Sequence, residues 1–186
     1  MKGIIFTEFF DMVEQKFGYE MVDTLLNESD LPSGGIYTTV GTYDHKEMVN
    51  LLVTLNQKTE IPLSLLLQTF GRYLFQKFTE IYSHLIHKAP DAFTFLGSID
   101  NYIHVEVKKL YPDAELPHFA IERLDDNTLV MNYLSIRKMP DLAYGLIEGA
   151  MLHFGEKATI TQELLTQDGS HVKFVIIKQY AGNRNS

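Results

Sequence analysis

Cysteine is absent from this chain of 186 residues. Its absence excludes disulfide bonds, cysteine-ligated zinc, iron–sulfur clusters and thiol-based redox sensing. No apolar run approaches the roughly 20 residues that a helix needs to cross a bilayer. The apolar first residues resemble a signal peptide, but Glu8, Asp11 and Glu14 interrupt them and no small-residue cleavage site follows. We therefore expect the amino-terminal segment to belong to the fold, and we expect a cytoplasmic protein that does not bind membranes.

Positive charge is scarce as well. Lys and Arg together number 16 against 24 Asp and Glu, which leaves a net charge of −8. Nucleic-acid binding depends on clustered Lys and Arg that contact phosphates, so this balance argues against a nucleic-acid partner. The acidity fits solubility, or attraction to a basic partner surface. The apolar fraction of 45% is ordinary for one domain that buries a core.

The motifs of common enzyme classes are also missing. The chain has no Gly-rich phosphate loop, no His-Glu-x-x-His pair, no serine nucleophile elbow and no Cys–His pair. His84 and His87 are three residues apart and could bind a metal from one helix face, but a solvated surface is the more common reason for such a pair. We therefore expect a protein that is not an enzyme.

Apolar residues recur at helical spacing through the first 111 residues. Asp44 and Glu47 have the spacing of a capping box, Pro62 suits the first turn of a long helix, and Pro112 ends the last helix of this part. Gly18 is a suitable end for the first helix, and residues 27–35 have the composition of a loop. The predicted helices cover residues 3–17, 20–26, 44–55, 62–81 and 91–110.

The pattern changes after Pro112. Strands are predicted over residues 119–124, 128–137, 158–165 and 171–179, joined in pairs by turn residues. A helix that begins at Pro140 and ends at Gly155 is inserted between the two hairpins. The fold class is therefore α+β, a mostly helical amino-terminal part followed by a small antiparallel sheet with an inserted helix. Residues 1–180 are expected to form one domain, and residues 181–186 a flexible tail.

Three polar residues alternate in the second predicted strand. Tyr133, Ser135 and Arg137 would share one face, while Leu134 and Ile136 would point to the other. Two hydroxyl groups and a guanidinium would then lie within roughly 13 Å, given the rise per residue of a strand. That arrangement suits a planar acid with two carboxylates, such as haem. Taken alone, the alternation is more often the solvent-facing side of a half-buried strand.

His104 lies beside the apolar stripe of the helix predicted over residues 91–110. A single helical imidazole is how many proteins hold haem iron, and it leaves the opposite axial position open. A structural histidine is the more common reason for such a position. Asp100, four residues earlier, could accept a hydrogen bond from the imidazole, although a surface charge is the more common interpretation. Large apolar residues of the first half could wall a flat cofactor or form plain core: Ile5, Phe9, Phe70, Leu74 and Phe78.

Together these patterns resemble the haem–nitric oxide/oxygen-binding (H-NOX) domain, which occurs alone in bacteria and as the sensor region of animal soluble guanylate cyclases. The match extends over the chain to about Tyr180. It rests on the following segments: Met1-Lys2-Gly3-Ile4-Ile5, Ala92-Phe93, Ile99-Asp100 ahead of His104, Val105 with Lys109-Leu110-Tyr111-Pro112, Leu116-Pro117, and Tyr133-x-Ser135-x-Arg137. The spacing from the helical histidine to the last motif also agrees with the family.

The resemblance implies a cofactor and a role for each matching residue. The cofactor is haem b (protoporphyrin IX iron), held between the two parts of the fold, with His104 as its proximal iron ligand. Tyr133, Ser135 and Arg137 would hold the propionates, and Pro117 matches the proline that presses on the porphyrin. By position along the chain, the lining of the distal side would comprise Ile5, Leu74, Phe78, Leu142 and Leu146.

The resemblance also bears on the gas and on the output. Some relatives that bind oxygen stably use a distal tyrosine on the helix after the motif. Leu142 stands there in this chain and cannot donate a hydrogen bond, and Tyr144 is about 200° further round the helix. We therefore expect tight binding of nitric oxide, weaker binding of carbon monoxide, negligible binding of oxygen, and release of His104 when nitric oxide binds. The signal would pass to a separate sensor histidine kinase or cyclic-di-GMP synthase or phosphodiesterase. An oxygen sensor or a haem carrier of the same fold, or a cofactor-free binding domain, are the alternatives.

Overall fold

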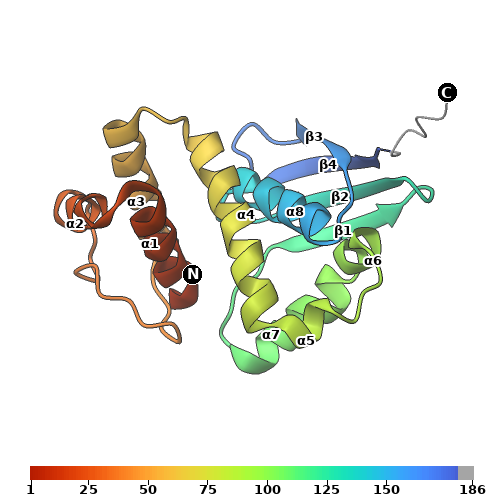
Figure 1. Cartoon of the computed structure of the whole chain (residues 1–186), viewed down its shortest axis with the longest axis horizontal. Helices are drawn as coiled ribbons and strands as arrows, with labels where there is room; N and C mark the ends of the chain where they lie inside the picture. The colour runs from red at the N-terminus through yellow and green to blue at the C-terminus, as the bar shows by residue number, and fades with distance from the viewer. Residues whose placement is uncertain (180–186) are drawn as a thin grey trace.

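The elements follow one another in the predicted order of helices, hairpin, helix and hairpin. The structure is a computed structural model that describes residues 1–179 (Figure 1), and the predicted tail over residues 181–186 lies outside them. The helices are α1 (Gly3–Phe17), α2 (Tyr19–Glu28), α3 (His45–Thr59), α4 (Leu63–Ile81), α5 (Ser83–Ile86), α6 (Ala92–Gly97), the π-helix η1 (Ile99–Ile103), α7 (His104–Leu110) and α8 (Pro140–His153). The strands are β1 (His118–Arg123), β2 (Thr128–Leu134), β3 (Ala158–Leu164) and β4 (His171–Lys178). The predicted α+β class is confirmed.

The amino-terminal helices form a lobe of their own. Figure 1 shows α1, α2 and α3 on one side of α4, with α8 and the sheet on the other. Apolar side chains spaced three and four residues apart on these helices meet in one core, as amphipathic helices require. The largest fully buried members of that core are Phe6, Phe9, Met12, Leu25, Met48, Leu51, Leu55, Phe70 and Leu74.

The sheet forms the second lobe. Its strand order is β1-β2-β4-β3, and every neighbouring pair is antiparallel. Alternate residues of β2 and β4 point to the face that carries α8, and the other residues point away from it, which is the usual pattern of a sheet covered on one side. The buried side chains of that face include Phe119, Leu129, Met131, Tyr133, Val172, Phe174 and Ile176.

Helices α4 and α8 join the two lobes at a close crossing. A Cβ atom on Gly71 would collide with the carbonyl oxygen of Leu142, and one on Gly145 would collide with that of Gln68. Only glycine allows backbones to approach so closely. Arg72 and Glu148 form an ion pair across the same two helices.

The helix predicted over residues 91–110 is not continuous. It is divided into α6, η1 and α7, with a π-helical turn over Ile99–Ile103 in which the Ile103 amide donates to the Ser98 carbonyl five residues back. Such a turn inserts one residue and rotates everything after it, and π-turns are frequent at functional sites. Apolar periodicity does not detect this, because only seven residues of helix, His104–Leu110, follow the inserted residue and are too few to show a shifted stripe.

Two further predictions were wrong in part. The strand predicted through Arg137 ends at Leu134, because a tight turn begins there and Lys138 adopts a positive φ of 55°. The capping box is half formed: Asp44 accepts from the Lys46 amide at 3.0 Å, whereas Glu47 turns inward to Ser33 and Tyr37.

Two negative findings apply to residues 1–179. None of the helices described there has the length and apolar character needed to cross a membrane. No group of three or more His, Cys, Asp or Glu side chains among those residues is arranged to hold a metal ion, so His84 and His87 take part in no such group.

Candidate functional site

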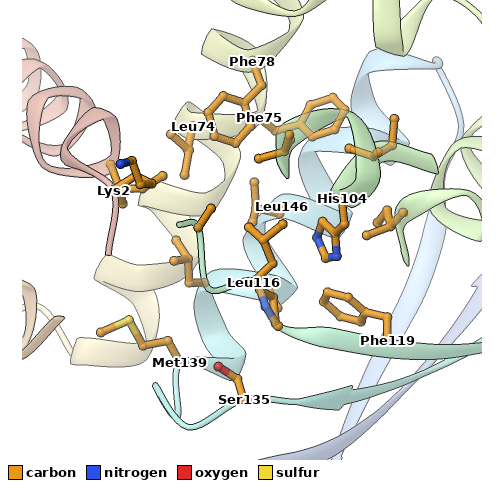
Figure 2. A pocket seen from close by; sticks show the side chains of 18 of the residues that line it. Lys2, Leu74, Phe75, Phe78, His104, Leu116, Phe119, Ser135, Met139 and Leu146 are labelled. Atoms are coloured by element: carbon orange, nitrogen blue, oxygen red, sulfur yellow. The ribbon is translucent and has the colours of Figure 1, made fainter. Parts of the chain in front are cut away.

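A cavity of about 270 Å³ lies between the lobes, bounded by α1, α4, α8, the η1–α7 segment and the start of the sheet. Figure 2 shows His104 and Phe119 on one side of it, and Lys2 and Leu74 on the other. Its lining includes each residue for which the sequence predicted a binding role: Ile5, Leu74, Phe78, His104, Pro117, Tyr133, Ser135, Arg137, Leu142 and Leu146. Residues that are up to 141 positions apart in the chain therefore share one surface.

His104 is the first residue of α7, directly after the π-helical turn. Its Nδ1 atom lies 3.3 Å from Asp100 Oδ1. A carboxylate accepts hydrogen bonds and does not donate them, so this contact holds the proton on Nδ1 and leaves the Nε2 lone pair unprotonated. Burial lowers the pKa of His104, and the Asp100 carboxylate opposes that shift. The site therefore presents a neutral imidazole whose Nε2 has no hydrogen-bond partner among residues 1–179.

Asp100 is held in place by more than His104. Its Oδ1 atom also accepts from the Phe119 amide at 3.1 Å, and its Oδ2 atom lies 2.6 Å from His118 Nδ1. The interpretation of Asp100 as a surface charge was therefore wrong. The i to i+4 spacing of Asp100 and His104 was the available signal, but the contacts from β1 depend on how the chain folds back.

Tyr133 lies at the end of β2 and is 3% exposed. Its ring packs against Phe119 and Phe174, with centroid distances of 5.6 and 6.4 Å. The hydroxyl accepts a hydrogen bond from the Met139 amide at 3.2 Å, and burial raises its pKa. The phenol is thus a fixed neutral donor at the edge of the cavity.

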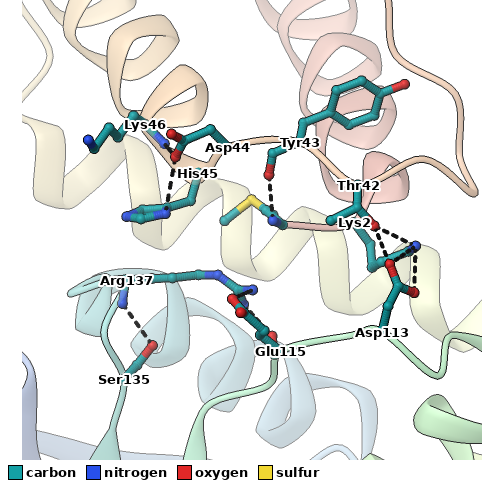
Figure 3. Close-up of polar contacts among 11 residues, drawn as sticks. Lys2, Thr42, Tyr43, Asp44, His45, Lys46, Asp113, Glu115, Ser135 and Arg137 are labelled. Atoms are coloured by element: carbon teal, nitrogen blue, oxygen red, sulfur yellow. Dashed lines mark hydrogen bonds and ion pairs between the residues drawn. The ribbon is translucent and has the colours of Figure 1, made fainter. Parts of the chain in front are cut away.

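Ser135 and Arg137 reach the cavity from the turn that follows β2, not from the strand (Figure 3). The Ser135 amide donates to the Ser170 carbonyl at 2.9 Å, and the Arg137 amide donates to Ser135 Oγ at 3.2 Å. The Arg137 guanidinium donates to the Glu115 carbonyl oxygen and lies 3.4 Å from Glu115 Oε2. All three residues line the cavity, and the turn after β2 brings Ser135 and Arg137 there instead of the predicted strand alternation.

Another part of the cavity lining is made by aliphatic and aromatic side chains. We call it the leucine wall, and define it as Ile5, Leu74, Phe78, Leu142 and Leu146. We define the histidine wall as the lining residues His104, Pro117, Phe119, Tyr133, Ser135 and Arg137, together with Asp100, which contacts His104. Two residues that the sequence offered as possible lining, Phe9 and Phe70, are fully buried in the core of the amino-terminal lobe instead.

Tyr144 does not supply a donor to the leucine wall. Its hydroxyl lies 3.5 Å from the Ile160 carbonyl oxygen, and its side chain packs against the core of the sheet lobe. This position agrees with the rotation of about 200° from Leu142 that two residues make on a helix.

Sequence reasoning missed a pair of cavity-lining tyrosines. Tyr82 and Tyr111 place their hydroxyl groups 3.2 Å apart, and burial raises the pKa of Tyr82. Tyr82 is four residues after Phe78, so it extends the same helical stripe, and that spacing was the available signal. Tyr111 follows α7, and only the fold brings it to Tyr82.

The residues around the cavity fit a haem group. A haem requires an axial ligand with a free lone pair, apolar surface for its ring, and donors for its carboxylates. His104 Nε2 meets the first requirement, and the leucine wall with Phe119 meets the second. The Tyr133 and Ser135 hydroxyl groups and the Arg137 guanidinium, whose pKa is lowered by burial, meet the third.

Comparison with known proteins agrees with this fit. The family model for haem-NO-binding (HNOB) domains matches residues 2–162. The structure is similar to the crystal structure of the Fe(II) unliganded H-NOX protein from K. algicida, with 45% identity, a TM-score of 0.93 and coverage of 97% of each chain. The search of curated proteins found none that matches.

Two other solved structures extend the likeness. The H-NOX from Shewanella woodyi, solved in solution with IWP-051 bound and in the Fe(II)CO state, is 41% identical, with a TM-score of 0.83 and coverage of 100% of this chain and 98% of that one. An H-NOX protein from S. oneidensis in the Fe(II)NO state is 29% identical, with a TM-score of 0.90 and coverage of 97% and 100%. The chain therefore belongs to the haem-NO-binding (H-NOX) family, whose domains bind haem and have the fold of a haem-based gas sensor.

Proposed function

We propose that residues 1–180 act as a single nitric oxide sensor domain, not as an enzyme, with haem b in the cavity and His104 as its proximal ligand. In this proposal nitric oxide binds on the side of the leucine wall and His104 is released. The observation that carries it is a neutral imidazole, held by Asp100 at 3.3 Å, that enters a cavity whose facing wall has no hydrogen-bond donor among its defined side chains.

The proposed task of His104 is to hold the iron reversibly. Bound haem would supply an iron centre that His104 could hold and that could bind a gas. Asp100 keeps the Nδ1 proton in place, so Nε2 remains available as a donor. His104 begins α7, and its release would free the start of that helix.

The residues after α7 provide a path from His104 to the amino-terminal lobe. Asp113 lies 3.1 Å from Lys2 Nζ and accepts a hydrogen bond from Thr42 at 2.6 Å (Figure 3). A shift of α7 would therefore pull on the segment that leads into α1. The segment after α7 thus connects the cavity with the amino-terminal lobe. Allosteric coupling requires such a structural element, whose position both sites can influence.

The proposed task of the Tyr133–Arg137 segment is to bind the two propionates. Arg137 provides charge and a fork of donors, and Tyr133 and Ser135 provide hydroxyl groups that neighbouring backbone contacts already orient. Pro117, directly before β1, has a fixed φ and lines the cavity beside His104. We propose that this rigid ring would press on a bound porphyrin.

The leucine wall supports the preference for nitric oxide. Bound oxygen carries partial negative charge and needs a donor, which Leu142 cannot supply, whereas nitric oxide depends on one much less. The S. oneidensis and S. woodyi relatives were solved with nitric oxide and carbon monoxide, respectively. We propose that this chain binds both gases, nitric oxide more tightly.

The output is proposed to pass to a separate chain, a sensor histidine kinase or a cyclic-di-GMP synthase or phosphodiesterase. Activity of a co-purifying kinase that changes with nitric oxide would support a sensor over a haem carrier.

Absorption spectra of the reduced protein test the central proposal. We expect a five-coordinate ferrous spectrum alone, a five-coordinate spectrum with nitric oxide in which the histidine bond is broken, a six-coordinate spectrum with carbon monoxide, and no stable species on exposure to air. A stable oxy-ferrous spectrum would contradict the proposed gas preference. Absence of a Soret band would contradict haem binding itself.

A further inference from the structure

Asp100 contacts two histidines, one inside the cavity and one outside it. Its Oδ1 atom faces His104 Nδ1 at 3.3 Å, and its Oδ2 atom faces His118 Nδ1 at 2.6 Å. The His104 side chain is 17% exposed, whereas that of His118 is 62% exposed. His118 is the first residue of β1 and comes directly after Pro117. A solvent-facing side chain is thus connected to the proposed iron ligand through a single carboxylate.

The distance of 2.6 Å between His118 Nδ1 and Asp100 Oδ2 is that of an ion pair. A carboxylate oxygen can only accept, so His118 Nδ1 is the atom that would donate in this contact. Asp100 shares its charge among two imidazoles and an amide. It therefore accepts a weaker hydrogen bond from each of these three groups than it would from a single donor.

The amide of Phe119 determines what happens when His118 is removed. It donates to Asp100 Oδ1 at 3.1 Å, which is the same oxygen that faces His104. Oδ1 is therefore anchored by the β1 backbone independently of the His118 side chain. Without His118, Asp100 keeps its position and more of its negative charge stays available to His104.

We propose that His118 is a positioning residue that acts on His104 through Asp100, by occupying Oδ2 and so limiting how strongly Oδ1 accepts the Nδ1 proton of His104. The proposal rests on the proposed role of His104 as iron ligand. A weaker acceptor at Nδ1 makes Nε2 a poorer electron donor, because the imidazole carries less negative charge. His118 therefore weakens the bond that nitric oxide is proposed to break.

The chain offers matched variants for a test. His118→Ala removes the contact at an exposed position and leaves the cavity lining intact. His118→Asn places an amide nitrogen close to the position of Nδ1 and restores a donor. Asp100→Asn removes the carboxylate charge. His171→Ala is the control, because the strand register places His171 in the same cross-strand row as His118, two strands away.

The measurement is the iron–imidazole stretching frequency of the reduced, haem-loaded protein by resonance Raman, together with the reduction potential. We expect His118→Ala to raise the frequency and lower the potential, and His118→Asn to return both toward the wild-type values. Asp100→Asn should lower the frequency, and His171→Ala should change neither quantity.

Two results in His118→Ala would overturn the proposal. An unchanged frequency would mean that Asp100 does not transmit the effect of His118 to His104. A lower frequency would mean that Asp100 depends on His118 for its position. A wild-type protein with no iron–imidazole band would instead overturn the role of His104 and the proposed function with it. The two failures are therefore distinguishable in one set of spectra.

Discussion

The two walls of the cavity are built in opposite ways. On the histidine wall, His104 Nδ1, the Asp100 carboxylate and the Tyr133 hydroxyl have hydrogen-bond partners, and backbone amides of Phe119 and Met139 hold Asp100 and Tyr133. On the leucine wall, Leu74, Leu142 and Leu146 have no polar side-chain atoms and are held by packing between α4 and α8. Hydrogen bonds hold the histidine wall in specific directions, whereas the leucine wall is held by nonpolar packing alone.

This difference suits the two walls to different tasks. Directional contacts orient an imidazole and a guanidinium toward a bound group, because hydrogen bonds specify angles as well as distances. A wall with only shape excludes polar ligands that need a donor, because an unpaired polar group in an apolar site costs free energy. The histidine wall is therefore suited to hold a cofactor, and the leucine wall supports the proposed preference for nitric oxide.

Removal of the central group of the histidine wall should have the largest effect. We expect His104→Gly to abolish the iron–imidazole stretch of the reduced protein completely, because no other histidine among residues 1–179 lines the cavity. Added imidazole should restore it. If the purified partner is available, the variant should also signal like the nitric oxide-bound wild type. A band that persists without added imidazole would show that another residue holds the iron.

Addition of a donor to the leucine wall should change the gas preference. We expect Leu142→Tyr to stabilise bound oxygen by about 1.5–3 kcal/mol, the usual worth of a hydrogen bond to a charged group, which is roughly a 10- to 100-fold gain in affinity. Oxygen titration of the reduced protein measures it. Leu142→Phe, which has the ring without the hydroxyl group, should give no gain. An equal gain in both variants would mean that shape, not donation, controls oxygen binding.

Loss of the guanidinium should weaken retention of the cofactor. Arg137→Ala removes charge-assisted donors worth about 1.5 kcal/mol or more, so we expect haem transfer to an acceptor protein to become roughly 10-fold faster. Arg123→Ala is the control, because Arg123 packs over the Phe93 ring outside the cavity lining. Equal rates in the two variants would contradict a role for Arg137 in binding propionates.

The smallest effect should come from the turn that carries Arg137. Lys138 lies 2.9 Å from Asp168, and this contact lowers the pKa of the Asp168 carboxyl. A carboxyl whose pKa is lower in the folded state stabilises the fold above its ordinary pKa of 3.8, and this contribution is lost as the pH falls toward the folded-state value. We therefore expect Asp168→Asn to lower the urea midpoint slightly at pH 6, and the difference to shrink below pH 4.

The exposed turn residue Asp126 supplies the control for this last experiment. Its side chain is 98% exposed, so Asp126→Asn should leave the midpoint unchanged at each pH. A difference between wild type and Asp168→Asn that does not depend on pH would indicate lost packing instead of lost charge.

Much of the fold could be predicted from local patterns. Helical spacing in residues 3–17 and alternation in residues 171–178 each describe one amphipathic surface, and such a surface has only one stable way to be buried. The π-helical turn at Ile99–Ile103 could not be predicted, because it depends on one extra backbone residue. The direction in which His104 points depends on this turn, so the sequence pattern did not predict it either.

The sequence named residues that line the cavity, but it did not predict their geometry. Tyr133, Ser135 and Arg137 were grouped because their spacing matches a family motif. Their contact with the cavity depends on the turn at Lys138, where a non-glycine residue adopts a positive φ. Asp100 was misjudged because two of its three partners, His118 and Phe119, come from a strand that begins 18 residues later.

The sequence by itself determined the α+β class, the absence of thiol chemistry, the helical histidine and the motif that marks the family. These depend on residue type and short-range spacing, which are present before the chain folds. The tertiary structure decided which nitrogen of His104 is free, what holds Asp100, and which side chains form the wall across the cavity. Those properties depend on distances between segments far apart in the chain, and only the packing of α4 and α8 against the sheet sets them.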